Sequence, residues 1–194
     1  MNENLAYQYT SDSEPWREEL IGGTWVAMAP AVTDHNRIKL NISSLFWSYL
    51  GDRECEVLPD GEVVFLTEND YFIPDVMVVC DPDKVRKDGV HGAPDLVAEV
   101  LSPGTAKRDR GYKKDVYERS GVKEYWLLDP AGKSLEQYLL RDGKYHLENV
   151  YTIYPEWMKK RMKPQELAAI QTEFKCSLYD DLTIRLEDIF RRVP

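Results

Sequence analysis

Two acidic side chains stand in strongly apolar stretches of this 194-residue sequence. Asp75 precedes the apolar run 76–80, and Glu99 lies inside the run 96–101. A buried carboxylate is costly unless it is paired, hydrogen-bonded or bound to a cation. If the two stretches pair as strands, Asp75 and Glu99 could converge on a hard divalent cation such as Mg²⁺ or Mn²⁺, which binds carboxylate oxygens together with water.

A lysine on the segment after Glu99 could complete this chemistry. Lys113 shares one helical face with Asp109 and Tyr117 at four-residue spacing, so Asp109 can orient the lysine through an ion pair. A bound metal polarises a phosphate and acidifies water, while a lysine positions that water or balances the charge of the transition state. The set therefore indicates phosphodiester hydrolysis, with Lys113 at least partly exposed to solvent. For either acid alone, a strand-end contact or a nearby Arg would be the preferred explanation.

The spacing of apolar and turn residues predicts the elements that position these side chains. Gly22-Gly23 predicts a β-hairpin over residues 17–28, and Ile38, Ile42 and Phe46 predict a helix capped by Thr33 or Asp34. Further strands are predicted at 54–58, 62–66, 71–80, 95–101, 124–129, 134–140, 144–151 and 182–186, and helices at 105–120, 157–171 and 187–191. The order predicts an α/β fold with a mixed sheet: a flexible tail over 1–14, then one domain over 15–194.

The composition narrows the class of protein. At 43% hydrophobic and 30% charged residues, the chain is an ordinary globular sequence. The longest apolar runs fall far short of the roughly 20 residues that cross a bilayer, and no secretory signal is recognisable, so we expect no membrane association. The odd, widely spaced cysteines Cys55, Cys80 and Cys176 favour separate buried thiols and a location in the reducing cytoplasm.

The charge pattern limits the contact that nucleic acid could make. A net charge of −9 excludes a protein that coats nucleic acid non-specifically, because such binding depends on Lys and Arg displacing counterions. A local basic run is present, and it could meet phosphates beside the metal: Lys107, Arg108, Arg110, Lys113 and Lys114. The ordinary explanation for such a run is a solvated helix face.

Several of these motifs together resemble a known family. They are Pro74-Asp75, Glu99-Val100-Leu101-Ser102-Pro103, Asp109 with Lys113 and Tyr117, and the segment 121–130. The sequence resembles the Uma-type endonucleases of the PD-(D/E)xK superfamily over most of its length. This resemblance implies a restriction endonuclease-like core, a mixed sheet flanked by helices, often a homodimer, with DNA as the substrate and Mg²⁺ or Mn²⁺ as the cofactor. Leu101 occupies the usual lysine position of the motif, and the resemblance implies that Lys113 replaces it, with Lys114 as the less suitable substitute.

The resemblance also implies a role for individual residues. Asp75, Glu99 and Lys113 are catalytic, and the Val100 carbonyl joins the two acids as a metal ligand. Asp109, Tyr117, Glu19 and His35 are supporting residues, and the phosphate contacts come from Lys107, Arg108, Arg110 and Lys114. Glu19 could instead be an exposed strand glutamate, and His35 a helix-start histidine satisfied by backbone. A different class of function stays open: a catalytically inactive dimeric binding protein on the same fold, which the net charge favours.

Overall fold

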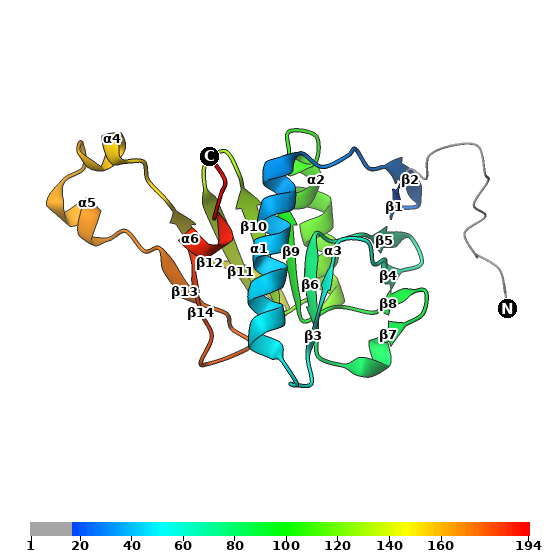
Figure 1. Cartoon of the computed structure of the whole chain (residues 1–194). Helices are drawn as coiled ribbons and strands as arrows, with labels where there is room; N and C mark the ends of the chain where they lie inside the picture. Colours follow the sequence, from blue (N-terminus) through cyan, green and yellow to red (C-terminus); the bar gives the residue numbers. More distant parts are fainter. Residues whose placement is uncertain (1–16) are drawn as a thin grey trace, which may run out of the picture.

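The central sheet of the fold contains Glu99, and one of its strands begins directly after Asp75. The structure, a computed structural model, describes residues 17–194, so the tail predicted over 1–14 lies outside the described residues. The strand order in this sheet is β12-β11-β10-β9-β6-β3 (Figure 1). Its strands are β3 (Glu56–Pro59), β6 (Val76–Val79), β9 (Leu96–Val100), β10 (Glu124–Asp129), β11 (Ser134–Arg141) and β12 (Lys144–Thr152). Strands β9 and β10 are parallel and the other neighbours antiparallel, which confirms the predicted mixed sheet.

A second sheet, in the order β2-β1-β5-β4-β8-β7, lies beside the first. It comprises β1 (Glu18–Ile21), β2 (Thr24–Ala27), β4 (Val64–Thr67), β5 (Asp70–Phe72), β7 (Val85–Arg86) and β8 (Gly89–His91). The N-terminal hairpin is confirmed by pairs such as Leu20 with Trp25. The single strand predicted over 71–80 is wrong, because β5 and β6 belong to different sheets. Pro74, which has no N–H to donate, lies at the break, so Asp75 stands where the chain passes between the sheets.

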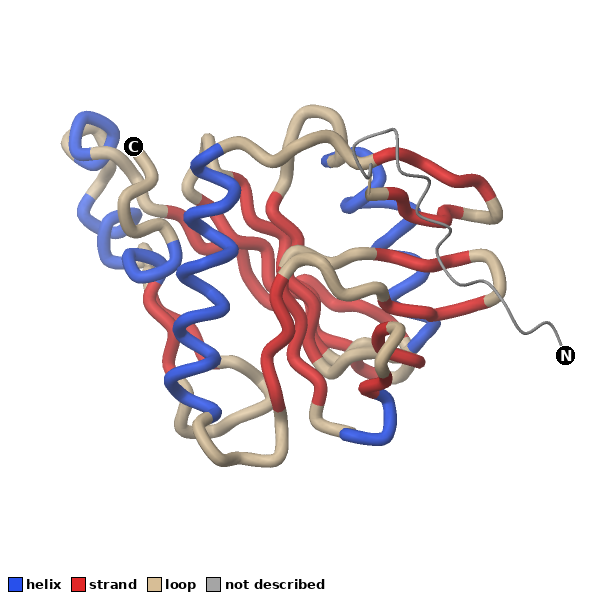
Figure 2. The backbone as a smooth tube through the Cα atoms, turned by 45° about the vertical axis from the view of Figure 1, so that its right-hand side comes forward, coloured by secondary structure: helices blue, strands red, loops and turns tan. Residues whose placement is uncertain are grey.

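Helices cover the central sheet unequally (Figure 2). On one face, α1 (Thr33–Leu50) packs Ile38, Ile42 and Phe46 into a core completed by the C-terminal elements. These are β13 (Glu173–Lys175), β14 (Thr183–Arg185) and α6 (Leu186–Ile189). The predicted cap of α1 is wrong: Val32 precedes the helix, and no side chain caps it. Among the described helices, none is long and apolar enough to span a bilayer.

The other face carries the broken helical segment that includes Lys113. The helix predicted over 105–120 consists of α2 (Ala106–Arg108), a π-helical turn η2 (Asp109–Lys113) and α3 (Lys114–Ser120), which packs Val116 and Tyr117 into the second core. Gly121 ends it with φ 93°, the left-handed conformation that its glycine predicted. Turns of the π type occur often at functional sites. Here the turn buries Asp109 and Lys113 together.

The segment predicted as one helix over 157–171 forms an extension from the body instead. It contains two short helices, α4 (Glu156–Lys159) and α5 (Pro164–Ala168), separated just before Pro164, which is suited to a first helical turn and not to an interior. Figure 1 shows both helices projecting away from the sheets. We call residues 154–172 the arm. The short 3₁₀ helix η1 (Pro82–Lys84) lies in a loop between β6 and β7.

Two of the three cysteines contradict the expectation of separate thiols. Strands β3 and β6 pair Glu56 with Val79, which brings the preceding Cys55 opposite the following Cys80, and a disulfide joins them. Their separation of 25 residues gave no indication of this pairing, which depends on strand register. Cys176 is the expected buried free thiol.

Candidate active site

The register of β6 and β9 brings Asp75 and Glu99 to one place. The strands are antiparallel with Val76 opposite Ala98, so one further step of the register sets Asp75 opposite Glu99. The backbone N–H of Val100 donates a hydrogen bond of 2.7 Å to Asp75 Oδ2. The exposed fractions of the two acids are 6% and 4%. Two carboxylates that lie 24 positions apart in the sequence are thus buried side by side.

Lys113 lies at the centre of a group of acids. Its Nζ is 2.7 Å from Glu99 Oε1, 2.9 Å from Glu19 Oε1 and 3.9 Å from Asp109 Oδ1. The predicted pair with Asp109 is therefore the longest of the three. Lys113 is only 3% exposed, so the expectation of partial solvent exposure is wrong. The reason is tertiary: strand β1, which carries Glu19, lies against the helical segment and supplies a partner that helical periodicity cannot reveal.

Two hydrogen bonds fix the acids that contact this lysine. Glu19 is buried, and its Oε1 accepts a 2.9 Å bond from the backbone N–H of Ile73, one residue before Pro74. The explanation of Glu19 as an exposed strand residue is therefore wrong. Tyr117 donates its hydroxyl to Glu99 Oε1 at 2.8 Å. The structure thus brings two of the four predicted supporting residues, Glu19 and Tyr117, into contact with the cluster.

Helix α1 presents two nitrogen-bearing side chains to Asp75. His35 Nε2 is 3.2 Å from Asp75 Oδ2, so its ring faces the acid and not the backbone alone. Its Nδ1 is buried without a hydrogen-bond partner among the described residues. Lys39 Nζ lies 2.8 Å from Asp60 and 3.7 Å from Asp75 Oδ1. Lys39 was not among the predicted site residues. Its position could have indicated a role, because it is a lysine one helical turn after His35, among the apolar residues that α1 buries.

The cluster holds more negative charge than its cations neutralise directly. Burial, reinforced by Asp109, Asp75 and Glu19 and opposed by Lys113, raises the pKa of Glu99 to about 8. Burial also raises the pKa of Asp109. Burial alone would lower the pKa of Lys113, but Glu19, Glu99 and Asp109 outweigh it and raise that pKa, so the lysine is a cation at neutral pH. Neighbouring ionisable groups with strongly shifted pKa values are typical of functional sites.

Similarity to known proteins identifies the family of this chain. Residues 2–169 match the family described as "Uma2: Putative restriction endonuclease". The chain belongs to this family. Two uncharacterized proteins of Synechocystis sp. (strain ATCC 27184 / PCC 6803 / Kazusa) are similar to it. The protein sll1609 is 32% identical over 126 residues, 63% of this chain and 71% of its own, and slr1290 is 31% identical over 139 residues, 70% and 73%.

A solved structure shows the same fold. The crystal structure of "a putative nuclease belonging to DUF820" from Anabaena variabilis ATCC 29413 superposes with a TM-score of 0.66 at 17% identity, over 89% of each chain. At that identity the likeness concerns the fold, and the predicted family and fold class are both confirmed.

Another buried carboxylate of this Uma2 chain shows what a purely structural acid looks like. Glu124 is 0% exposed, yet it is fully bonded: Trp126 Nε1, Gln137 Nε2 and the backbone N–H of Ser177 donate to it at 2.6–2.7 Å, as does the Ser177 hydroxyl at 2.6 Å. Neutral donors alone satisfy this charge. The acids around Lys113 compete for one cation instead, which distinguishes the two sites.

The residues fit a divalent cation as a two-carboxylate site. Within residues 17–194, no three His, Cys, Asp or Glu side chains are arranged to hold a metal ion together. Mg²⁺ does not require three, since it commonly keeps several waters and takes one or two carboxylates. Hydrogen bonds within the described part of the chain use Asp75 Oδ2 and Glu99 Oε1, and each acid has a second oxygen outside those bonds. The excess negative charge is the second reason that a cation fits.

The structure separates the basic residues that the sequence grouped together. Arg110 pairs with Glu136 at 2.9 Å, and Lys114 Nζ lies 4.3 Å above the ring of Tyr138. Both are therefore engaged by their own chain. Lys107 and Arg108, on α2, form no ion pair among the described residues. Of the four residues predicted to contact phosphates, Lys107 and Arg108 thus carry a charge that no carboxylate of the described residues neutralises.

The pH dependence of stability follows from the raised pKa of Glu99. Since this pKa rises from 4.5 to about 8 on folding, the folded chain binds more protons than the unfolded chain between those values. The contribution of Glu99 to the free energy of unfolding is then fully present below about pH 4.5 and is lost as the pH rises through 8. We expect the melting temperature in EDTA to fall across this range and to fall less in Glu99→Gln. Scanning calorimetry over a pH series measures it, and identical slopes for the two proteins would contradict the assignment.

Proposed function

We propose that the chain is a metal-dependent endonuclease that hydrolyses phosphodiester bonds in DNA. The observation that carries the proposal is a buried group of acids around one lysine, with more negative charge than that lysine neutralises. Asp75, Glu99 and the Val100 carbonyl would hold Mg²⁺ or Mn²⁺. When bound, this ion polarises the scissile phosphate and acidifies a water molecule.

The other residues act through position and charge. Lys113 is cationic, so it cannot accept a proton at neutral pH; it holds Glu99 in place at 2.7 Å and would offset charge that develops on the phosphate. Tyr117 fixes the same Glu99 oxygen. His35 would position Asp75 through the 3.2 Å contact between its Nε2 and Asp75 Oδ2, and its Nδ1 remains for a further hydrogen bond. Lys107 and Arg108 would contact the substrate phosphates.

The setting of this activity is also part of the proposal. We expect a homodimer, as the family resemblance implies, and a location in the reducing cytoplasm, as the spacing of the cysteines suggested. In that compartment Cys55 and Cys80 would be kept as thiols, because disulfides are rare there. Strands β3 and β6 remain paired by their backbone hydrogen bonds in either state.

A catalytically inactive binding protein is the second candidate. Two observations favour it: the net charge of −9, and the near-closure of the cluster, in which even the most exposed side chain, that of His35, is 13% accessible. The fold alone is compatible with both functions.

A cleavage assay separates the two candidates. Supercoiled plasmid, linear duplex, single-stranded DNA and RNA are each incubated with the purified chain in Mn²⁺, Mg²⁺ or EDTA. We expect cleavage of DNA in Mn²⁺ and none in EDTA. If no substrate is cut in either metal, and Mn²⁺ leaves the melting temperature unchanged, the endonuclease proposal fails and the binding protein is favoured.

A further inference from the structure

The arm carries a dense group of cations. Lys159, Lys160, Arg161 and Lys163 lie within five positions, next to Trp157. Lys159 pairs with Glu156 at 2.9 Å. The remaining three are exposed, and within residues 17–194 none of their side-chain nitrogens has a carboxylate oxygen within 4.0 Å, although the backbone N–H of Lys163 donates to Glu166 Oε2 at 2.6 Å. In a chain of net charge −9, this is a local concentration of uncommitted positive charge.

An aromatic residue accompanies these cations. Trp157 is 58% exposed, and the guanidinium carbon of Arg161 lies 5.7 Å from the centre of its ring. A cationic surface with an accessible aromatic ring is typical of proteins that bind the backbone and bases of nucleic acid.

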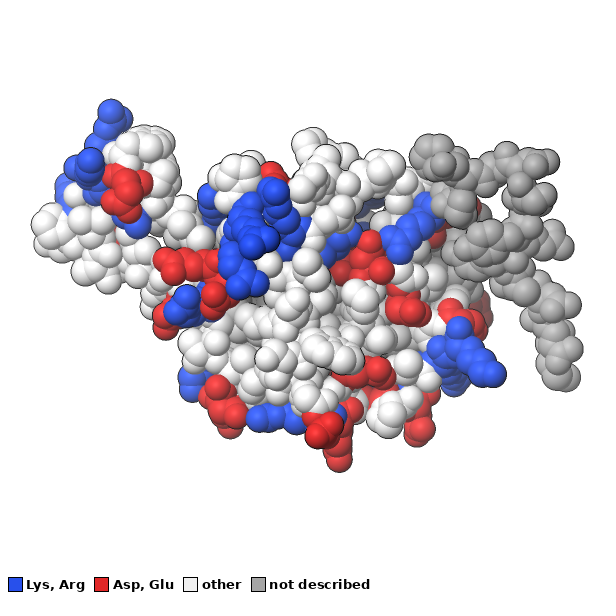
Figure 3. Space-filling model, viewed as in Figure 1, with Lys and Arg blue, Asp and Glu red and all other residues white. Residues whose placement is uncertain are grey.

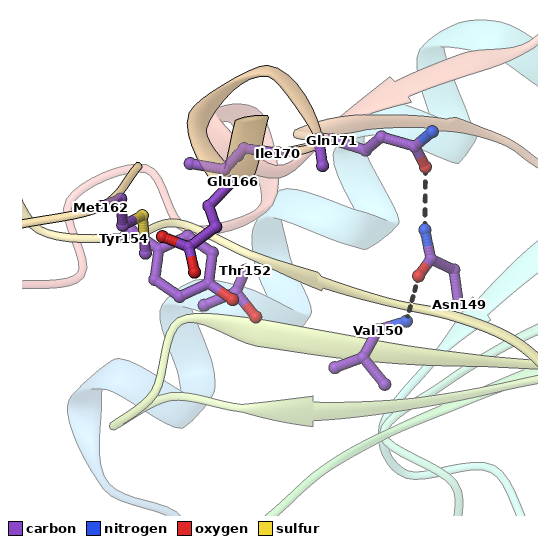
Figure 4. A pocket seen from close by; sticks show the side chains of 9 residues that line it. Asn149, Val150, Thr152, Tyr154, Met162, Glu166, Ile170 and Gln171 are labelled. Atoms are coloured by element: carbon purple, nitrogen blue, oxygen red, sulfur yellow. Dashed lines mark hydrogen bonds between the residues drawn. The ribbon is translucent and has the colours of Figure 1, made fainter. Parts of the chain in front are cut away.

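The arm is not packed closely on its own body. A hollow of about 380 Å³ lies between β12 and the arm, lined on opposite sides by residues such as Thr152 and Met162 (Figure 4). The side chain of Asn149 bridges part of it by donating to Gln171 Oε1 at 2.8 Å. The hollow is at the base of the arm and not at the acids around Lys113. The basic side of the arm therefore remains available to a partner.

A second group of cations faces the same side of the molecule. Figure 3 shows Lys and Arg side chains on the arm and again on the body, over α1 and α6. The chain there carries exposed Arg191 and Arg192 directly after α6, and the carbonyl of Arg191 accepts a bond from Asn41 of α1. One face thus presents two separated basic groups, as an extended polyanion would require.

We propose that the arm binds the sugar–phosphate backbone of a nucleic acid, with Lys160, Arg161 and Lys163 on phosphates and Trp157 against a sugar or base. The proposal rests on the proposed function for its choice of polyanion. It accounts for how an acidic protein gains affinity for nucleic acid, because three cations of the predicted run at 107–114 are engaged internally and the arm supplies others. In this arrangement the arm supplies affinity and the acids near Lys113 supply the chemistry.

A second copy of the chain is the competing partner. Leu147 and Val150 on the edge strand β12 are exposed, which suits an apolar contact. Against this, three cations in four positions would be expensive to desolvate in such an interface without matching acids. We therefore favour nucleic acid, and dimer formation becomes an outcome of the test.

The test compares two matched double variants. Lys160→Ala with Arg161→Ala removes one lysine and one arginine from the arm, and Arg86→Ala with Lys87→Ala removes the same two residue types, both exposed, near β7. Binding of a fluorescent DNA duplex and of a single strand is followed by anisotropy in EDTA over a salt series. We expect the arm variant to bind about tenfold or more weakly, with a log–log salt slope smaller by about 2, and the β7 variant to match the parent.

The outcomes separate this proposal from the catalytic one. Binding is measured without divalent metal, and Asp75→Asn is expected to bind like the parent, so a failure of cleavage leaves the result intact. Equal affinities and slopes for the parent and the arm variant would overturn the proposal, as would a parent that binds neither probe. A change in sedimentation of the arm variant without a change in DNA affinity would assign the arm to a protein interface instead.

Discussion

Lys113→Ala should lower the free energy of unfolding by about 3–5 kcal/mol, because it leaves buried acids without their shared cation. Carboxylate oxygens of Glu99, Glu19 and Asp109 lie 2.7, 2.9 and 3.9 Å from the lysine Nζ. For a chain of this size the loss corresponds to a fall in melting temperature of roughly 6–20 °C. Thermal unfolding followed by circular dichroism at neutral pH measures it.

The adjacent lysine provides the control for this prediction. Lys114 is half-buried and lies 4.3 Å over the ring of Tyr138, so Lys114→Ala should cost no more than about 1 kcal/mol. If Lys113→Ala and Lys114→Ala had the same melting temperature, Lys113 could not be the cation that stabilises the buried acids.

Asp75→Asn should reduce cleavage at least about 100-fold while the chain stays folded, because the proposed metal ligand loses its charge with almost no change of shape. The asparagine oxygen can still accept the N–H of Val100, which Asp75 accepts at 2.7 Å. The initial rate of plasmid cleavage in Mn²⁺, per mole of folded protein, measures the effect.

Glu124→Gln is the matched control, because it also neutralises a buried acid but lies in the network of neutral donors around Trp126 and Ser177. Its folded fraction should cut DNA at the parent rate. A cleavage rate that fell equally in both variants would show that loss of a buried charge, and not loss of the site, explains the result.

The sequence was most informative where local pattern decides structure. Strand β10 has the predicted bounds, 124–129. The proximity of Asp75 and Glu99 was foreseen because both acids interrupt apolar runs that could only be buried strands. The high energetic cost of burying a single carboxylate was enough to identify Asp75 and Glu99 as candidate site residues.

The features that were missed depend on contacts between distant segments. The break between β5 and β6 is invisible to periodicity, since both parts are apolar and only the assembled sheets separate them. The burial of Lys113 depends on Glu19, which lies 94 positions away. Lys39 was overlooked because its partner Asp60 lies 21 positions away, in a turn that signalled only a reversal of the chain.

The most direct measurement is the anomalous scattering of Mn²⁺ in crystals of the parent chain. A metal site at these two acids predicts one strong peak at coordination distance, about 2.1 Å, from carboxylate oxygens of both Asp75 and Glu99, and the absence of this peak in Asp75→Asn. Crystals in which Mn²⁺ binds elsewhere, while both carboxylates stay as they are around Lys113 and His35, would contradict a metal-dependent site at this position.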